Sequence, residues 1–150
     1  ASEHARIGFV FNKIGITPEA CSSWFLPRIV GIAQALEWVY SADILKPEEA
    51  LAGRFVKAIL PADQLLEEAY KIARRITQFS PVAIALTRQM MYRCAAQPHP
   101  IEAHKVDSLA IYYTSLNSGK EGVRSFLEKR PPVFTQRTST DMPPFYPWWE

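Results

Sequence analysis

Glu19 is an acidic residue at a predicted helix start, a setting that is compatible with proton transfer. It follows Thr17 and Pro18, a pair typical of a helix start, with threonine as the cap and proline at the first helical position. Partial positive charge at a helix N-terminus favours an ionised carboxylate, whereas apolar neighbours such as Phe11 favour the neutral form. Such opposed influences suit a base that takes up and returns a proton. By its position alone, however, Glu19 is more typical of an ordinary acidic residue in a first helical turn.

Other reactive side chains are set less favourably for chemistry. Cys21 follows the same helix start and could be a nucleophile, but no histidine lies near it in sequence, and a small buried thiol is the better interpretation. His99 and His104, with Glu102 between them, lack the i, i+4 histidine spacing of a helical metal site, so we expect no metal. With only Cys94 besides Cys21, no disulfide framework is expected, and we predict a cytoplasmic protein.

The composition predicts one or two small globular units. Of the 150 residues, 48% are hydrophobic and 21% are charged, which is enough apolar material for an ordinary core. The formal charge of +2 is spread along the chain without basic runs, so nucleic acid is not an expected partner. No apolar run approaches the length of a membrane span and no signal-peptide pattern is seen, so we expect no membrane insertion.

The predicted secondary structure that must position these residues changes near Pro61, from mixed strand and helix to helix alone. Before it we expect two strands, and the first places the start of the chain inside a sheet. A strand needs neighbours for its backbone groups, so we expect that an N-terminal half is missing. The expected strands are 5–11 and 55–60, and the expected helices are 18–29, 33–40 and 47–53.

After Pro61 the pattern is helical almost to the end. Ser80-Pro81 predicts one helix start, and Ser118 to Glu121 is a capping-box sequence that predicts another. The residues from 133 to 150 are rich in proline and aromatic rings and should be irregular, with the rings packed on a neighbouring subunit or on the missing half. The expected helices are 63–78, 81–94, 101–117 and 118–130.

Three segments carry a recognisable pattern: ARIGFVFNKIGITPEACSSWFLPRIVG at 5–31, ALEWVYSADILKPEEALAGRFVKAILP at 35–61 and GKEGVRSFLEKRPP at 119–132. In this order they resemble the C-terminal half of the crotonase (enoyl-CoA hydratase/isomerase) superfamily. The resemblance implies an α/β crotonase-like fold, of which this part is mostly α-helical with two short strands. It also implies three regions: 1–61 as the end of the ββα spiral core, 62–132 as a helical trimerisation unit and 133–150 as a tail.

The resemblance implies that an acyl-CoA thioester is the substrate. Members stabilise its enolate with two backbone N–H groups, both on segments absent from this sequence. In hydratase-type members two glutamates act on water and carbon, and Phe11 stands at the position of the second. In isomerase-type members one glutamate moves a proton between two carbons, and Pro18 to Ser23 (PEACSS) resembles the segment that carries it. The resemblance therefore implies that Glu19 is the proton shuttle and that Phe11 lines the acyl pocket.

A second binding segment is implied near the end of the last helix. The family's F-x-E-K pattern matches Phe126 and Lys129, which by resemblance would contact the coenzyme A held by a neighbouring subunit. Coenzyme A would enter as part of the substrate, with no separate cofactor. A lysine in the last turn of a helix is also what the helix dipole favours, so a purely structural role for Lys129 stays open.

Three functional hypotheses follow. The first is an enoyl-CoA isomerase with Glu19 as the proton shuttle, and the second is an enoyl-CoA hydratase. Both imply a homo-oligomer, a trimer or a dimer of trimers. The third is a non-catalytic assembly or binding module, because the oxyanion segments are absent. We expect the 150-residue chain alone to have little or no activity.

Overall fold

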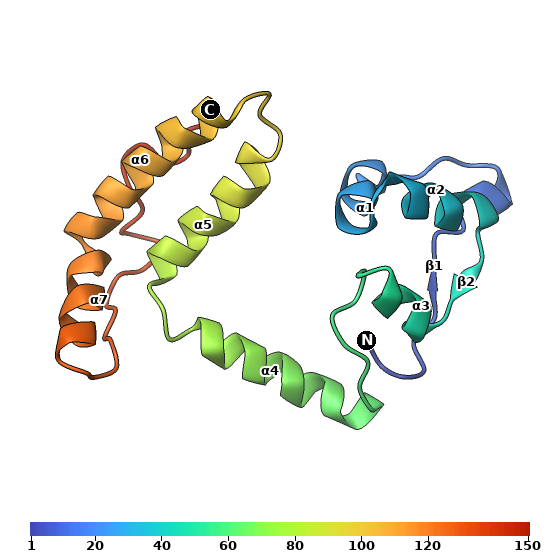
Figure 1. Ribbon diagram of the computed structural model, residues 1–150, viewed down its shortest axis with the longest axis horizontal. Coiled ribbons are helices and arrows are strands. Elements are labelled where there is room, and N and C mark those ends of the chain that lie inside the picture. Colours follow the sequence, from blue (N-terminus) through green and yellow to red (C-terminus); the bar gives the residue numbers. More distant parts are fainter. The chain divides into compact units, whose positions relative to one another are not determined.

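The computed structural model describes all residues from Ala1 to Glu150. The chain forms two compact units, Ala1–Tyr70 and Lys71–Glu150 (Figure 1). It is mostly α-helical with two short strands, as the sequence predicts. The change of unit lies within helix α4 (Leu65–Ile76). The finer division at 61 and 132 stays a prediction.

The first unit combines a two-stranded antiparallel ribbon with three helices. Strand β1 pairs with β2 so that Ile7 lies opposite Leu45 and Gly8 lies opposite Ile44. The elements are β1 (Ile7–Gly8), the 3-10 turn η1 (Asn12–Ile14), α1 (Ser22–Val30), α2 (Ile32–Ser41), β2 (Ile44–Leu45), α3 (Pro47–Ala52) and the 3-10 turn η2 (Ala62–Gln64).

The predicted strands are only partly confirmed. Strand 5–11 is confirmed at Ile7–Gly8 alone, because η1 begins soon afterwards. The predicted strand at 55–60 is wrong. There the amides of Phe55 and Val56 both donate to the carbonyl of Ala50 and so fold back on α3. Leu60 makes only an isolated parallel bridge, with Ser2.

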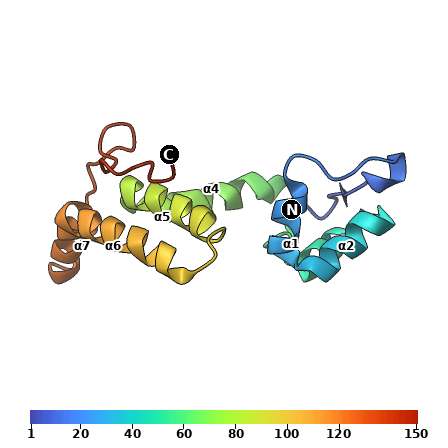
Figure 2. The same ribbon diagram turned by 90° about the horizontal axis from the view of Figure 1, so that it is seen from above.

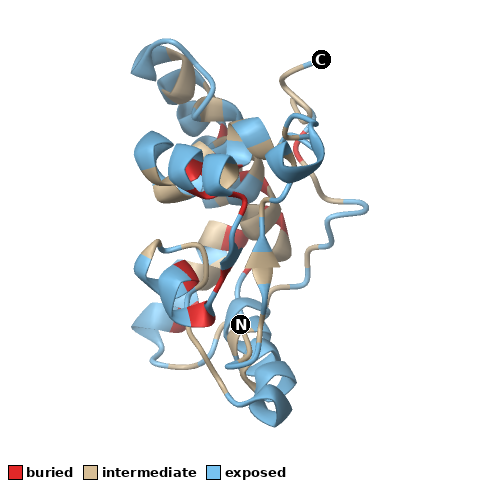
Figure 3. Cartoon of the chain, turned by 90° about the vertical axis from the view of Figure 1, so that its right-hand side faces the viewer, coloured by how far each residue is buried: buried red, intermediate tan, exposed pale blue.

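Trp38 is at the centre of the first unit's core. It is 1% exposed, stacks on Phe9 with ring centroids 6.0 Å apart and meets Phe55 edge-on. Its indole Nε1–H donates to Glu49 Oε1 at 3.1 Å, so the one polar atom of the buried ring has a partner. Gly53 lies so close that an added Cβ would be 2.5 Å from Trp38 Cη2. In Figure 3 the buried residues are red, and they make up a small part of the chain.

The second unit is a helical assembly with an irregular tail. Its helices are α5 (Pro81–Cys94), α6 (Pro100–Leu116) and α7 (Ser118–Leu127). Helix α5 packs on α6, and α6 packs on α7 (Figures 1 and 2). The buried apolar residues of these helices are Val82 and Leu86 in α5 and Ala110 in α6.

The helix starts in this unit follow the sequence with two exceptions. Ser80 Oγ accepts from the Ala83 amide at 3.3 Å, which confirms the predicted cap of α5. His99 Nδ1 accepts from the Ile101 amide at 3.1 Å, a cap of α6 that sequence reasoning missed. The predicted capping box at α7 is wrong. Ser118 is already inside the helix and buried, and the Glu121 carboxylate accepts hydrogen bonds from the tail instead.

The tail has no helix or strand, as predicted. Some of its rings contact helices of the second unit, and the expected packing on a neighbouring subunit or on the missing half stays a prediction. Phe145 meets Tyr113 edge-on at 6.2 Å, and the Arg93 guanidinium lies 4.3 Å from the centre of a Trp149 ring. The Tyr113 hydroxyl donates to the carbonyl of Asp141 at 2.9 Å and so fixes the tail on α6. No helix of the chain combines the length and apolarity that a bilayer crossing requires.

Candidate functional site

Glu19 lies in a turn that leads into α1. The helix begins at Ser22, not at Pro18 as predicted, because Ala20 and Cys21 adopt left-handed backbone angles, with φ of 51° and 58°. The Ser22 amide and hydroxyl both donate to the Glu19 carbonyl, at 2.9 and 2.6 Å. These two bonds fix the backbone of Glu19, while its side chain extends from an exposed position.

The carboxylate of Glu19 makes no hydrogen bond or ion pair in the structure. Phe11 is half-buried at the start of η1, and its carbonyl accepts from the Ile16 amide at 3.1 Å. The loop between Phe11 and Glu19 is therefore tied at both ends by backbone hydrogen bonds. Its acidic side chain remains available to an external group.

A cavity of about 370 Å³ opens beside this loop. Its size lies within the range of small-molecule sites. Pro18 and Ser22, the residues that flank the turn carrying Glu19, are part of its wall, whereas Glu19 and Phe11 themselves are not. The other wall residues are Asn12, Thr17, Ser23, Leu26 and Pro27 and, from α2, Ile32, Ala35, Leu36, Val39 and Tyr40.

The contribution of α2 to this wall was missed by sequence reasoning. Ile32 is 63% exposed and Tyr40 is 69% exposed, although both are large apolar or aromatic residues. The available signal was that α2 has apolar side chains on more than one face, since Trp38 faces the core while Ile32, Leu36 and Tyr40 do not. An apolar wall beside an unpaired carboxylate suits an apolar substrate that exchanges a proton.

Phe126 and Lys129 lie at the C-terminal end of α7, in the second unit. Phe126 is 81% exposed, and the Lys129 amide donates to the Phe126 carbonyl at 3.2 Å. Lys129 is exposed, has a left-handed φ of 52° and makes no ion pair. The structure thus places Phe126 and Lys129 at the two ends of one exposed turn. Glu19 belongs to the other unit.

An ion-pair network holds this turn. Arg130 forms two hydrogen bonds to Glu121, at 2.6 and 3.0 Å, and a third to Glu128 at 2.6 Å. The Val133 amide also donates to Glu121, at 2.8 Å, and Arg124 donates to Glu128 at 2.9 Å. Hydrogen bonds from Arg130 and Val133 lower the pKa of Glu121 to about 2. Those from Arg124 and Arg130 lower the pKa of Glu128.

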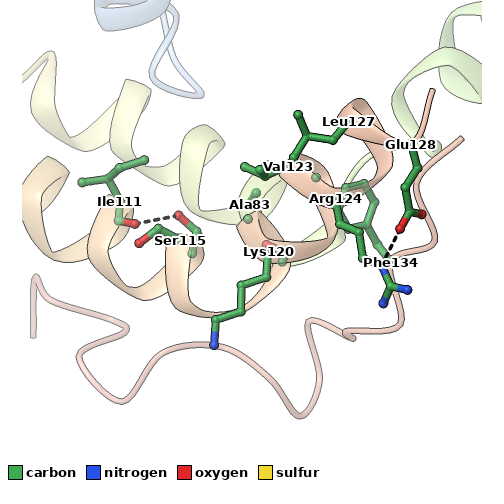
Figure 4. Close-up of a pocket in the computed structure, with 13 residues that line it drawn as sticks. Ala83, Ile111, Ser115, Lys120, Val123, Arg124, Leu127, Glu128 and Phe134 are labelled. Atoms are coloured by element: carbon green, nitrogen blue, oxygen red, sulfur yellow. Dashed lines mark hydrogen bonds and ion pairs between the residues drawn. The ribbon is translucent and has the colours of Figure 1, made fainter. Parts of the chain in front are cut away.

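A groove of about 830 Å³ runs along α6 and α7 and was not predicted. Figure 4 shows Ile111, Val123 and Leu127 on its wall, with the Arg124–Glu128 pair at one end. The wall is chiefly apolar. It brings together no pair of acid and base side chains other than this ion pair.

The two cysteines are unpaired and differ in environment. Cys21 is exposed, so the prediction of a buried thiol at that position is wrong, and Cys94 is half-buried in α5. Burial, with a smaller effect of Asp107, raises the pKa of the Cys94 thiol. No group of three or more histidine, cysteine or acidic side chains is placed to hold a metal ion.

Comparison with known proteins gives a consistent result. The family model described as enoyl-CoA hydratase/isomerase matches residues 1–137. The enoyl-CoA hydratase ACTT3 of Alternaria alternata is 40% identical over 139 residues, which are 89% of this chain and 46% of that protein. The crotonyl-CoA hydratase of Syntrophomonas wolfei is 30% identical over 141 residues, which are 91% of this chain and 53% of that protein.

Solved structures agree with these relatives. The crystal structure of an enoyl-CoA hydratase from Bacillus anthracis has a TM-score of 0.84 and 26% identity, and the match covers 91% of this chain and 53% of that one. An enoyl-CoA hydratase subunit from Geobacillus kaustophilus has a TM-score of 0.82 and 28% identity, with coverages of 91% and 53%. The chain spans about half the length of the curated relatives it matches.

Proposed function

The chain belongs to the enoyl-CoA hydratase/isomerase family, and from this premise we propose that it forms part of an acyl-CoA enzyme in which Glu19 moves the proton. The remainder of the acyl-CoA site, including the two N–H donors for the thioester oxygen, would come from residues outside this chain. The fold is crotonase-like, in agreement with its solved neighbours.

The proposed reaction is a double-bond shift in an enoyl-CoA. Glu19 accepts a proton from C2 of a 3-enoyl thioester, and the electron pair of that C–H bond passes into the thioester enolate. The enolate is stabilised by the N–H donors. The protonated Glu19 then returns the proton to C4 as the double bond forms between C2 and C3, so no atom is gained or lost.

One observation carries this proposal. Glu19 is an exposed carboxylate without a partner, and the residues on either side of its turn line an apolar cavity of about 370 Å³. An acyl chain in that cavity would contact Pro18 and Ser22, on either side of the turn that carries Glu19. Phe11, half-buried at the other end of the loop, is proposed to line the acyl pocket of the complete site.

Phe126 and Lys129 are proposed to contact the coenzyme A of a substrate held by a neighbouring subunit. Support comes from their shared exposed turn, where the ring can stack on the adenine and the ammonium can meet a phosphate. This proposal requires a homo-oligomer, and a trimer or dimer of trimers is the assembly expected from the resemblance.

Hydration of a 2-enoyl-CoA is the second candidate reaction. The names of the relatives favour it, since ACTT3 and the Syntrophomonas wolfei protein are both called hydratases. Against it, Phe11 occupies the position where the resemblance places a second glutamate, and a phenyl ring cannot activate water. Glu19 would then have to act together with a carboxylate outside this chain.

The test is Glu19→Gln in the full-length protein that contains this chain. We expect isomerisation of a 3-enoyl-CoA to fall about 100-fold or more, because the amide cannot accept the proton. Glu48→Gln, an exposed glutamate on α3, is the matched control and should leave the rate unchanged. Measurement of 2-enoyl-CoA hydration in the same proteins assigns the reaction. Unimpaired isomerisation by the Glu19 variant would refute the role of Glu19.

The activity of the 150-residue chain alone separates an enzyme from an inert binding module. We expect little or no turnover of either enoyl-CoA, because the oxyanion donors are proposed to lie elsewhere. Substantial turnover by the isolated chain would contradict this division of the site.

A further inference from the structure

The turn after α7 has a backbone that its sequence does not favour. Lys129 adopts a left-handed φ of 52°, a region that residues with a Cβ atom rarely occupy. This backbone is a common way for a helix to end: the Lys129 amide donates to the carbonyl of Phe126 and the Arg130 amide to that of Ser125. The contacts around Lys129 show what holds the turn in this form.

Arg130 supplies most of those contacts. Its amide donates to the carbonyl of Ser125 at 3.0 Å, and Ser125 is only 3% exposed. Its guanidinium binds both oxygens of Glu121, at 2.6 and 3.0 Å, and one oxygen of Glu128 at 2.6 Å. Two-point binding of this kind fixes direction as well as distance. The Val133 amide donates to Glu121 Oε1 at 2.8 Å, and this oxygen also accepts from Arg130.

Within this network the cation left without an ion-pair partner is Lys129. Arg124 and Arg130 are both engaged by carboxylates, whereas Lys129, between Glu128 and Arg130 in the chain, has no carboxylate partner. Phe126, one helical turn earlier, is 81% exposed. The turn therefore carries an exposed aromatic ring and an unpaired ammonium three residues apart. This combination fits a ligand that joins an aromatic base to phosphate.

We propose that Glu121 and Arg130 are positioning residues, whose ion pair fixes the turn after α7 and thereby directs Phe126 and Lys129 toward the phosphate-bearing nucleotide end of coenzyme A. This inference rests on the proposed function, because it takes the contact of Lys129 with coenzyme A as given. It adds that the turn is already formed in the isolated chain. The turn should therefore bind coenzyme A by itself, with low affinity. Glu121 and Arg130 act through Lys129 and do not touch the ligand.

The experiment is a titration of the 150-residue chain with coenzyme A, followed by the amide NMR signals of Phe126 and Lys129. The variants are Lys129→Ala, Glu121→Gln, Arg130→Lys and the double variant Lys129→Ala/Glu121→Gln. Lys120→Ala is the matched control, since it removes a cation from α7, before the turn, that also has no carboxylate partner. Amide signals of α5 and α6 show whether each variant retains its fold, and Arg130→Lys provides a second probe that keeps the charge.

We expect saturable shifts in the wild type and in Lys120→Ala, and a loss of affinity of about tenfold in Lys129→Ala. Glu121→Gln and Arg130→Lys should each lose most of that factor. The double variant should bind no more weakly than Lys129→Ala, because a positioning residue has nothing left to position.

Two sets of results would overturn the inference. If Glu121→Gln and Arg130→Lys bind like the wild type, or if the losses in the double variant multiply, then the ion pair does not act through Lys129, and the contact of Lys129 with coenzyme A stands. If the wild type does not bind, or Lys129→Ala binds as well as the wild type, the turn is not a preformed contact for coenzyme A and the inference fails. The role of Glu19 is tested separately by turnover.

Discussion

At the scale of single residues, Gly53 shows how closely the first unit is packed. A methyl group there would lie 2.5 Å from Trp38 Cη2, so either the ring or α3 must shift. We expect Gly53→Ala to lower the free energy of unfolding by about 1–3 kcal/mol. Urea unfolding monitored by circular dichroism measures this change.

Gly122→Ala is the matched control for that substitution. Gly122 is inside α7, and an added Cβ would meet nothing within 4 Å. Alanine is favoured over glycine in a helix, so this variant should gain about 0.5–1 kcal/mol. Equal effects of the two substitutions would mean that the contact with Trp38 does not limit the side chain at position 53.

The ionisation of Glu121 makes the attachment of the tail depend on pH. Its pKa is lowered from 4.5 to about 2 by the hydrogen bonds from Arg130 and Val133. A lowered pKa in the folded state means that the ionised form is stabilised, so the contribution is complete above about pH 4.5 and is lost as pH falls toward 2. We expect the amide signals of Val133 and Arg130 to change over this range.

Glu121→Gln provides the control for the pH experiment, since it cannot ionise. Its tail signals at neutral pH should already resemble those of the wild type at low pH. Salt should weaken the wild-type attachment only partly, because the side chains of Arg130 and Glu121 are 34% and 24% exposed. A wild-type tail that is insensitive to pH between 4.5 and 2 would show that the pair does not hold it.

At the scale of the element, Ser80 determines where α5 starts. Its hydroxyl oxygen accepts from the Ala83 amide, and the residue is 4% exposed, so water cannot replace the bond. Ser80→Ala should cost about 1 kcal/mol of stability. Ser108→Ala, an exposed position inside α6, should change the stability by much less. Thermal unfolding compares the two, and equal midpoints would contradict a capping role.

Helices were predictable from the sequence wherever a local signal marks their ends. Pro47 and Ser80-Pro81 start α3 and α5, and Gly31 separates α1 from α2, all within a few residues of the chain. The strands were predicted only in part, at Ile7–Gly8, because a two-residue strand is defined by its partner. Ile44–Leu45 is too short to carry an alternating pattern, and the more β-prone 55–60 folds back on α3.

For the candidate site, too, local features were predictable from the sequence and tertiary contacts were not. The sequence predicted Glu19 in the first turn of a helix that begins at Pro18, but the helix begins four residues later, at Ser22, so Glu19 lies in the turn before it. The ion pair between Glu121 and Arg130 could not be predicted from the sequence. The i, i+3 spacing of Ser118 and Glu121 favours a capping box equally well. Only the fold shows that the tail reaches this carboxylate. Cavity walls contributed by α2 depend likewise on tertiary packing.

At the scale of the whole molecule, the chain consists of two units with α4 across their boundary. Helix α4 has no buried residue, so its backbone is held chiefly by its own hydrogen bonds. We expect brief native-state digestion with trypsin to cut first after Arg74 or Arg75, which are exposed. Mass spectrometry would then detect two fragments that meet at that position. Early cleavage after Arg88 or Arg93 of α5 would contradict this order.

Large apolar side chains are exposed in both units. They include Ile32 in α2, Leu66 in α4, and Ile111 and Leu127 in the second unit, each more than 60% exposed. Extended apolar surface of this kind is typical of surfaces that other protein segments cover. This agrees with a chain that spans about half of its relatives and with the oligomer proposed above.

The different settings of the two thiols allow one of them to be labelled selectively. Thiolate is the reactive form, and a raised pKa together with partial burial keeps Cys94 protonated and shielded near neutral pH. Cys21 is exposed and lies two residues after Glu19. A maleimide dye added at neutral pH would therefore attach beside the proposed base without any engineered cysteine, and its fluorescence would report directly on whether an acyl chain enters the neighbouring cavity.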